Sequence, residues 1–431
     1  LIIAETTQRV VRSTFITERL GQLQVKGLQR KVEAFRVVRE RPVDSRYEAA
    51  HGDTTVPLIG RFHEFGMLSE RWALAQAGQG QVVLLSGEPG IGKSRLVEAF
   101  CDSLEIPEGQ LVRMQCSPYL KDSAYHPLIE RLSRAAGFAS ADPATERLRK
   151  LEHLLDEGDT ELSETIPVYA ELLSIALDDR YRALHLQPQA LRDLTLRTLV
   201  RRFESISRRG PAVFVLEDAH WIDPSTQELL ERLLPHTQTM PALLMITHRP
   251  EWSSEWAAAY SNCTSISIGR IRRDQVRELI EAVTKEIWND TLIDEIIERT
   301  DGVPLFVVEL ARAIAEAGGS AVAGGEVIPA TLQGSLMARL DHLPSDLKSV
   351  AQTASIIGRD FDGDLLAKIV GIDQSSMRDA INRLQQSQII VRSAVSAEAF
   401  TFRHALIQDA AYQSLLTSRR RAYHDIIAET L

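Results

Sequence analysis

The stretch that decides the fold is Gly87-Glu88-Pro89-Gly90-Ile91-Gly92-Lys93-Ser94. Its spacing is Gly-x4-Gly-Lys-Ser, and it stands between the apolar run of residues 82–85 and a segment with apolar residues along one side. Glycines let successive backbone N–H groups face one concavity, and the N-terminus of the next helix adds partial positive charge. The stretch therefore predicts a P-loop for the phosphates of ATP or ADP.

By analogy with other P-loops, Lys93 is expected to reach the β- and γ-phosphates, and Ser94 to offer its hydroxyl to Mg²⁺. A chance Gly-rich turn would give the bare pattern in roughly one or two of a hundred chains of this length. The nucleotide-binding residues predicted here are Gly87, Glu88, Pro89, Gly90, Ile91, Gly92, Lys93, Ser94 and Arg95.

A second acidic site is expected, because Mg²⁺ keeps several waters and is held by carboxylates beside the phosphates. Glu217 and Asp218 supply it, since they directly follow the apolar residues 212–216. We favour Glu217 with Ser94 for the metal and Asp218 for orienting the attacking water, although the sequence alone leaves the reverse open.

A cation follows the next apolar run, residues 243–246, in the segment Thr247-His248-Arg249-Pro250. Arg249 at this strand end would sense or neutralise the γ-phosphate, whereas the alternative is an arginine in a surface loop. The catalytic residues predicted from these patterns are Lys93, Glu217, Asp218 and Arg249.

Composition sets wider limits. The chain has 431 residues, of which 44% are hydrophobic, and its length suggests two to four domains. A formal net charge of −10 argues against coating nucleic acid through a general positive field. Three scattered cysteines and no run of about 18 apolar residues lead us to expect a cytoplasmic protein with no membrane contact. Because the chain starts at Leu1 without methionine, we expect it to be a fragment.

Alternating apolar runs and amphipathic segments predict the fold class: an α/β P-loop NTPase domain with a parallel sheet and helices on both faces, then a helical lid domain and a winged-helix domain. Buried strands are expected at 82–85, 111–115, 213–216 and 243–246. Helices are expected at 273–282, 290–299, 305–315, 332–340, 347–357, 363–369 and 375–385, with wing strands at 389–392 and 400–403.

Domain boundaries follow from the same pattern. Residues 1–39 suggest a helix near Val10, extended runs at 23–28 and 32–38, and turns at Gly21 and Gly27. The domains expected beyond them are a linker at 40–56, the ATPase domain at 57–254, the lid at 255–328, the winged helix at 329–412 and the start of a further helical region at 413–431.

Residues 57–431 resemble the signal-transduction ATPases with numerous domains (STAND), a branch of the AAA-like P-loop ATPases. The resemblance rests on residues 58–64, 217–226, 247–250, 302–306 and 402–412. It implies that Gly60 and Arg61 lie near the base, that Pro304 packs near adenine, and that His404 meets the β-phosphate of bound ADP. It also implies a switch that ATP opens and slow hydrolysis resets.

Residues 20–28 and 32–37 resemble the end of a class III nucleotidyl cyclase domain. Together with residues 115–119 and 123–127, they make the chain similar to bacterial proteins that fuse an adenylate or guanylate cyclase to such an ATPase. The resemblance implies that residues 1–39 are the C-terminal remnant of the cyclase domain, whose catalytic residues lie upstream of Leu1. The implied partners are the attached cyclase and a protein bound beyond Leu431, with oligomer formation on activation.

We therefore predict an ATPase that regulates cyclic nucleotide synthesis by its parent cyclase. One alternative is a transcriptional regulator whose winged helix binds DNA, but the presumed recognition helix at 375–385 has only Arg378 and Arg383 as cations, so we expect no nucleic acid partner. The other alternative is a scaffold that holds nucleotide without turnover.

Overall fold

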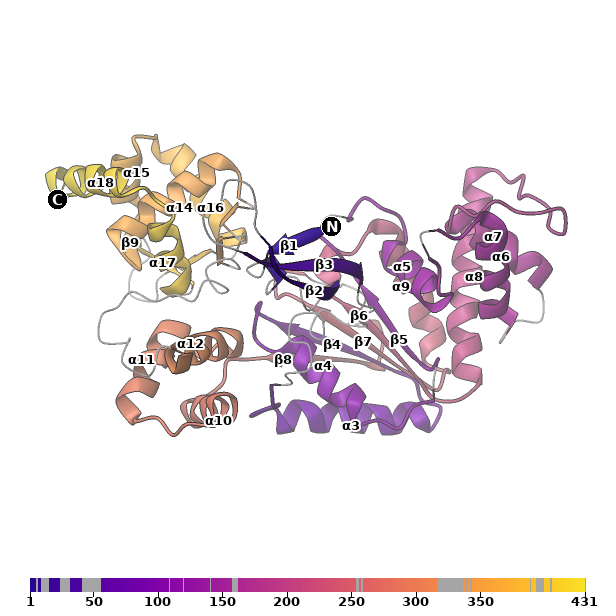
Figure 1. The fold of residues 1–431 in the computed structure, drawn as a ribbon. Helices are drawn as coiled ribbons and strands as arrows, with labels where there is room; N and C mark the ends of the chain where they lie inside the picture. The colour runs from indigo at the N-terminus through magenta and orange to yellow at the C-terminus, as the bar shows by residue number, and fades with distance from the viewer. Residues whose placement is uncertain are drawn as a thin grey trace. The chain divides into compact units, whose positions relative to one another are not determined.

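Figure 1 shows the computed structural model of the chain, which forms two compact units. The first unit comprises residues 1–89 and 93–268, and the second comprises residues 90–92 and 269–431. The structure describes residues 1–4, 7–8, 15–23, 32–40, 56–107, 109–118, 120–139, 141–156, 162–252, 256, 259–316, 336–337, 340–341, 343–387, 389–392, 399–403 and 405–430.

A five-stranded parallel sheet organises the first unit, in the order β5-β6-β7-β4-β8. The strands are β4 (Gln81–Gly87), β5 (Leu111–Gln115), β6 (Ala212–Glu217), β7 (Ala242–His248) and β8 (Cys263–Ile268). The expectation of a parallel sheet with helices on both faces is confirmed. Strands β6 and β7 are buried throughout, which is why they appear in the sequence as uninterrupted apolar runs.

Helices cover both faces of this sheet. Alternate strand residues such as Leu84 and Leu216 pack into a core with the helices on one face, while Val83 and Leu85 point to the opposite face. Figure 1 shows α3 and α4 together along one side of the sheet. The helices of this unit are α3 (Phe62–Gln76), α4 (Lys93–Asp102), α5 (His126–Ala135), α6 (Ala144–Asp156), α7 (Leu162–Leu172), α8 (Pro188–Arg208), the 3₁₀ turn η1 (Ala219–Trp221) and α9 (Pro224–Thr237).

The N-terminal residues contribute a separate antiparallel sheet, in the order β1-β3-β2. Its strands are β1 (Ile2–Ala4), β2 (Phe15–Leu23) and β3 (Val32–Glu40). The extended run at 32–38 is confirmed, but the expected turn at Gly21 is wrong. Gly21 pairs with Ala34 inside the ladder, where a register shift and a φ of +82° mark a bulge. The expected helix near Val10, the turn at Gly27 and residues 41–55 of the linker lie outside the described residues.

The second unit is mainly helical. Its helices are α10 (Arg273–Thr284), α11 (Asp290–Thr300), α12 (Pro304–Glu316), α14 (Ser345–Ile357), α15 (Gly363–Val370), α16 (Gln374–Gln386), α17 (Ala405–Gln413) and α18 (Thr417–Thr430). A small antiparallel sheet, in the order β10-β11-β9, consists of β9 (Asp360–Asp362), β10 (Ile390–Arg392) and β11 (Ala399–Phe402). The helices and wing strands expected between residues 347 and 403 are thus present, and the name winged helix remains our interpretation of them.

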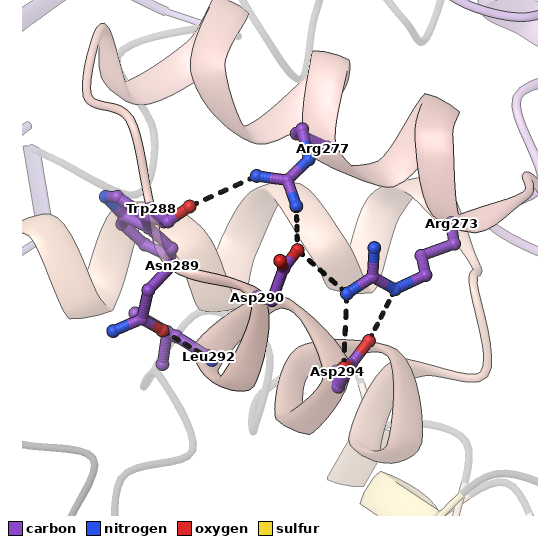
Figure 2. Close-up of polar contacts among 7 residues, drawn as sticks. All are labelled: Arg273, Arg277, Trp288, Asn289, Asp290, Leu292 and Asp294. Atoms are coloured by element: carbon purple, nitrogen blue, oxygen red, sulfur yellow. Dashed lines mark hydrogen bonds and ion pairs between the residues drawn. The ribbon is translucent and has the colours of Figure 1, made fainter.

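Charged side chains join α10 to α11 at the surface, as Figure 2 shows. Arg273 reaches Asp294 at 2.6 Å and Asp290 at 2.9 Å, and Arg277 also binds Asp290. The Arg273 guanidinium, together with Arg277, lowers the pKa of Asp290. Asn289 caps α11 by accepting a hydrogen bond from the Leu292 backbone at 2.9 Å. The ion pairs thus link the two helices at the surface, and the cap satisfies the first turn of α11.

The expected end of the ATPase domain at residue 254 precedes β8, which pairs with β4, so the first unit continues to Ile268. The region expected as lid and winged helix lies in the second unit from residue 269, with α18 beyond it. Among the described residues, every helix is too short or too polar to cross a bilayer.

Candidate nucleotide site

The P-loop connects the end of β4 to the start of α4. Gly90 and Gly92 have φ values of +78° and +100°, in the left-handed region that favours glycine. Lys93 is the first residue of α4, and its side chain is buried against the loop. Its Nζ donates hydrogen bonds to the carbonyl oxygens of Gly87 at 2.7 Å and Glu88 at 3.1 Å. The loop thus holds an ammonium group where the motif predicts phosphates.

Burial lowers the pKa of Lys93 from its ordinary value to about 8. The charge of Asp218 opposes this shift, whereas the positive charge of Arg249 adds to it. The carboxylate and the guanidinium predicted for the site therefore both act on the P-loop lysine. An anionic ligand beside Lys93 would favour its charged form, because opposite charges stabilise each other in a site shielded from water.

The P-loop and the acidic strand meet at Ser94 and Glu217. The Ser94 hydroxyl donates a hydrogen bond to Glu217 Oε2 at 2.9 Å. Glu217 is the last residue of β6 and only 3% exposed, and burial raises the pKa of its carboxyl group. A hydroxyl and a carboxylate oxygen are the hard ligands that Mg²⁺ prefers, so these two residues fit the metal that the motif implies.

Asp218 follows Glu217 in a different conformation. Its φ of +59° is left-handed, and the chain then turns into η1. The Asp218 backbone N–H donates to Thr247 Oγ1 at 3.0 Å, and Thr247 is buried near the end of the neighbouring strand β7. Two adjacent strands therefore fix the position of Asp218. The sequence placed Thr247 only within a sensor segment and gave no sign of this hydrogen bond.

Arg249 lies at the same edge of the sheet, just after β7. Its guanidinium stands 5.1 Å from the centre of the Trp221 ring and 3.9 Å from Glu251. Beside Trp221, both ring nitrogens of His220 are buried and have no hydrogen-bond partner among the described residues. Burial lowers the pKa of His220 to about 3, so this imidazole is neutral near pH 7. Arg249 is thus part of a structured site and not of a free surface loop.

Asp223, which the sequence did not single out as a site residue, connects the start of α9 to the segment before α5. Its carboxylate accepts hydrogen bonds from the Thr226 backbone at 2.9 Å and the Thr226 hydroxyl at 2.6 Å, which caps α9. It also accepts one from the Tyr125 backbone at 3.0 Å, immediately before α5. The order Asp-Pro-Ser-Thr at residues 223–226 is a helix-start signal that would have identified the cap.

The remaining predicted residues are more dispersed. Gly60 has a φ of +70°, and the buried Arg61 pairs with Glu64 at 3.1 Å at the start of α3. Arg95 Nε donates to the Val56 carbonyl at 2.5 Å. Pro304 is the first residue of α12 in the second unit, and His404 lies outside the described residues. The structure thus brings together Lys93, Ser94, Glu217, Asp218 and Arg249.

Comparison with known families agrees with this geometry. Residues 57–246 match the AAA ATPase domain family. The matched range contains the P-loop, Glu217 at the end of β6, Asp218 directly after it and most of β7.

Sequence relatives add little about function. An uncharacterized protein of Rhizobium meliloti (strain 1021) is 29% identical over 443 aligned residues, which cover 98% of this chain. The chain spans 42% of the length of that curated relative.

Similar solved structures include a STAND protein with a tetratricopeptide repeat sensor from Pyrococcus horikoshii, at 13% identity and a TM-score of 0.34, covering 86% of this chain and 45% of that one. A Thermotoga maritima RuvB variant has 14% identity and a TM-score of 0.37, covering 83% and 96%. Likeness at these scores decides neither fold nor function, and the fold assignment rests on the strand order.

Proposed function

We propose that the AAA ATPase domain binds MgATP, hydrolyses it slowly and acts as a nucleotide-dependent switch. The observation that carries this proposal is the hydrogen bond between Ser94 and Glu217 beside the buried Lys93. A P-loop that served only as a tight turn would not need a buried ammonium and a buried carboxylate at one edge of the sheet, because each costs free energy to desolvate.

Each group then has a role. Lys93 would exchange its two carbonyl partners for phosphate oxygens, and Ser94 and Glu217 would hold Mg²⁺, which supplies charge neutralisation on those oxygens. Asp218, fixed by Thr247, would orient the attacking water. Arg249 would respond to the γ-phosphate, which ATP has and ADP lacks. A switch requires such a difference, since a ligand that binds both states equally shifts neither.

Calorimetry with MgATP tests binding, and phosphate release tests turnover. We expect Lys93→Ala to abolish binding, and Asp218→Asn to bind MgATP but lose phosphate release. Lys368→Ala is the matched control, because it removes one exposed lysine charge from α15 and should leave both assays unchanged. Equal affinity of the wild type and Lys93→Ala would refute the proposal. Binding without release in the wild type would favour the scaffold alternative.

We further propose that the parent protein carries a class III adenylate or guanylate cyclase domain upstream, regulated by this switch. Two facts support it: residues 2–40 contain the three-stranded sheet to which the resembling segments contribute, and the chain spans 42% of its relative's length. In the full-length protein, Lys93→Ala should change cyclase activity with no substitution in the cyclase itself. Identical cyclase activity with and without MgATP would contradict this role.

The other expectations also stand as proposals. His404→Ala should speed ADP release more than it weakens ATP binding, if the histidine holds the ADP-bound state. A protein partner beyond Leu431 and oligomer formation on activation would complete the switch. DNA binding through α16 is not favoured, because one of its two cations, Arg383, pairs with Asp346 at 3.3 Å.

A further inference from the structure

Arg249, which the proposed function assigns to the γ-phosphate, lies over the indole ring of Trp221. The central carbon of its guanidinium group is 5.1 Å from the centre of the ring. The face of an aromatic ring attracts a cation within about 6 Å, and tryptophan gives the strongest attraction. Both side chains are partly shielded from solvent, which strengthens the contact. The ring can therefore hold the guanidinium in place.

Two adjacent strands bring the ring and the cation together. Trp221 is the last residue of η1, which follows β6, and Arg249 directly follows the neighbouring strand β7. The Trp221 backbone N–H donates to the Asp218 carbonyl at 2.9 Å, and the Asp218 N–H donates to Thr247 Oγ1 at 3.0 Å. The same pair of strand ends thus fixes both partners of the contact.

The ring of Trp221 is itself held on more than one side. The His220 ring lies against it, with 4.3 Å between the two ring centres. Another part of the indole packs against the hydrophobic core of the first unit. These contacts restrict the rotamers that Trp221 can adopt, and a ring with a fixed position also fixes the cation that lies over it.

Glu251 is the other charged neighbour of Arg249, and it holds the guanidinium less well. The two groups are 3.9 Å apart, and 35% of the Glu251 side chain is exposed, so the ion pair is weak. A carboxylate also accepts hydrogen bonds from a guanidinium and would compete with phosphate oxygens for them. A ring face attracts the charge without that competition, so Trp221 can hold Arg249 both before and after a phosphate binds.

We propose that Trp221 is a positioning residue that sets how strongly this site distinguishes ATP from ADP. It acts through Arg249, because the ring keeps the guanidinium at the edge of the sheet where the γ-phosphate would bind. Without the ring, the long arginine side chain samples more rotamers, and ordering it on the phosphate costs more conformational entropy. The inference rests on the proposed function, since it requires that Arg249 contacts the γ-phosphate.

Calorimetry with MgATP and MgADP measures this distinction as the ratio of the two affinities. Trp221→Leu should lower the affinity for MgATP about fivefold and leave that for MgADP unchanged, because ADP has no γ-phosphate for Arg249 to contact. Trp221→Tyr should keep most of the wild-type ratio, since a phenol ring also attracts a cation. Trp256→Leu is the matched control, because it removes another indole that packs partly against the same core, and it should change neither affinity.

The contact can also be read without nucleotide. Subtracting the fluorescence of Trp221→Phe from that of the wild type isolates the emission of Trp221. In the ligand-free protein, Arg249→Ala should shift this emission, because it removes a positive charge from the face of the indole. Adding Trp221→Leu to Arg249→Ala should weaken MgATP binding no further, since the ring acts only through the arginine.

The outcomes separate this inference from the function on which it rests. A wild type that binds no MgATP would overturn both. A wild type that binds MgATP, together with a folded Trp221→Leu variant that keeps the wild-type ratio, would overturn the role of Trp221 alone. Equal losses for MgATP and MgADP, or additive losses in the double variant, would reduce Trp221 to a packing residue and refute the proposal. Thermal unfolding shows whether each variant is folded, and if Trp221→Leu is not, an emission that Arg249→Ala leaves unchanged decides against the contact.

Discussion

Raising the pH should weaken MgATP binding through Lys93 alone. Its pKa is lowered to about 8 by burial, so the ligand-free lysine is mostly charged at pH 7 and mostly neutral at pH 9. With that pKa, the protonated fraction falls from about nine-tenths to about one-tenth between these values. Phosphate binding needs the charged form, so the affinity should be full below the pKa and fall about tenfold from pH 7 to pH 9, or about 1.4 kcal/mol.

Calorimetry in two buffers of different ionisation enthalpy measures both the affinity and the proton taken up. At pH 9 the binding of MgATP should take up close to one proton, because the polyphosphate restores the lysine charge. The last phosphate proton of ATP titrates at about pH 6 and does not interfere. Lys93→Met is the control and should bind weakly at every pH. A wild-type affinity that stays constant to pH 9 would refute the reasoning.

Three further changes test the supporting structure by urea denaturation. Asp223→Ala removes the α9 cap and the bond to the Tyr125 backbone, and should cost about 2–3 kcal/mol, whereas wild-type stability would contradict the cap. Arg273→Gln breaks exposed ion pairs and should lower the stability only slightly, with the difference lost at high salt; a cost that salt leaves unchanged would count against it. Arg113→Met strands its partner Glu98, 2.7 Å away, at a cost of about 2–4 kcal/mol, and adding Glu98→Leu should restore stability. A double variant as unstable as the single one would be the contrary result.

The central strands could be predicted because burial on both faces leaves them as apolar runs. β8 was missed for the opposite reason. It lies at the edge of the sheet, and only Ile266 and Ile268 are buried among polar neighbours. A half-buried strand of this kind alternates in the sequence and gives a weaker signal than a continuous run. The domain boundary expected at residue 254 therefore falls before β8, although β8 belongs to the same sheet.

The P-loop and its acidic partner could be predicted because the two motifs are known to bring a serine and a carboxylate together, as Ser94 and Glu217 show. The strand order could not be predicted from the sequence, and it determines which residues contact Asp218. β7 lies between β4 and β6, so Thr247 reaches the backbone of Asp218. Asp223 contacts a segment 98 positions away, near Tyr125, which no local pattern encodes. Long-range polar contacts of this kind depend on the assembled sheet.

Glu217 at the end of β6 and Asp218 directly after it show what geometry adds to a motif. In the sequence they are adjacent carboxylates with interchangeable roles. In the structure Glu217 still has extended backbone, is nearly inaccessible and accepts a hydrogen bond from Ser94, whereas Asp218 has turned into the left-handed region and is only partly buried. A carboxylate that binds the metal together with the P-loop serine must lie next to that serine. A carboxylate that orients the attacking water must be accessible to water. Glu217 meets the first requirement and Asp218 the second, which supports the proposed assignment over its reverse.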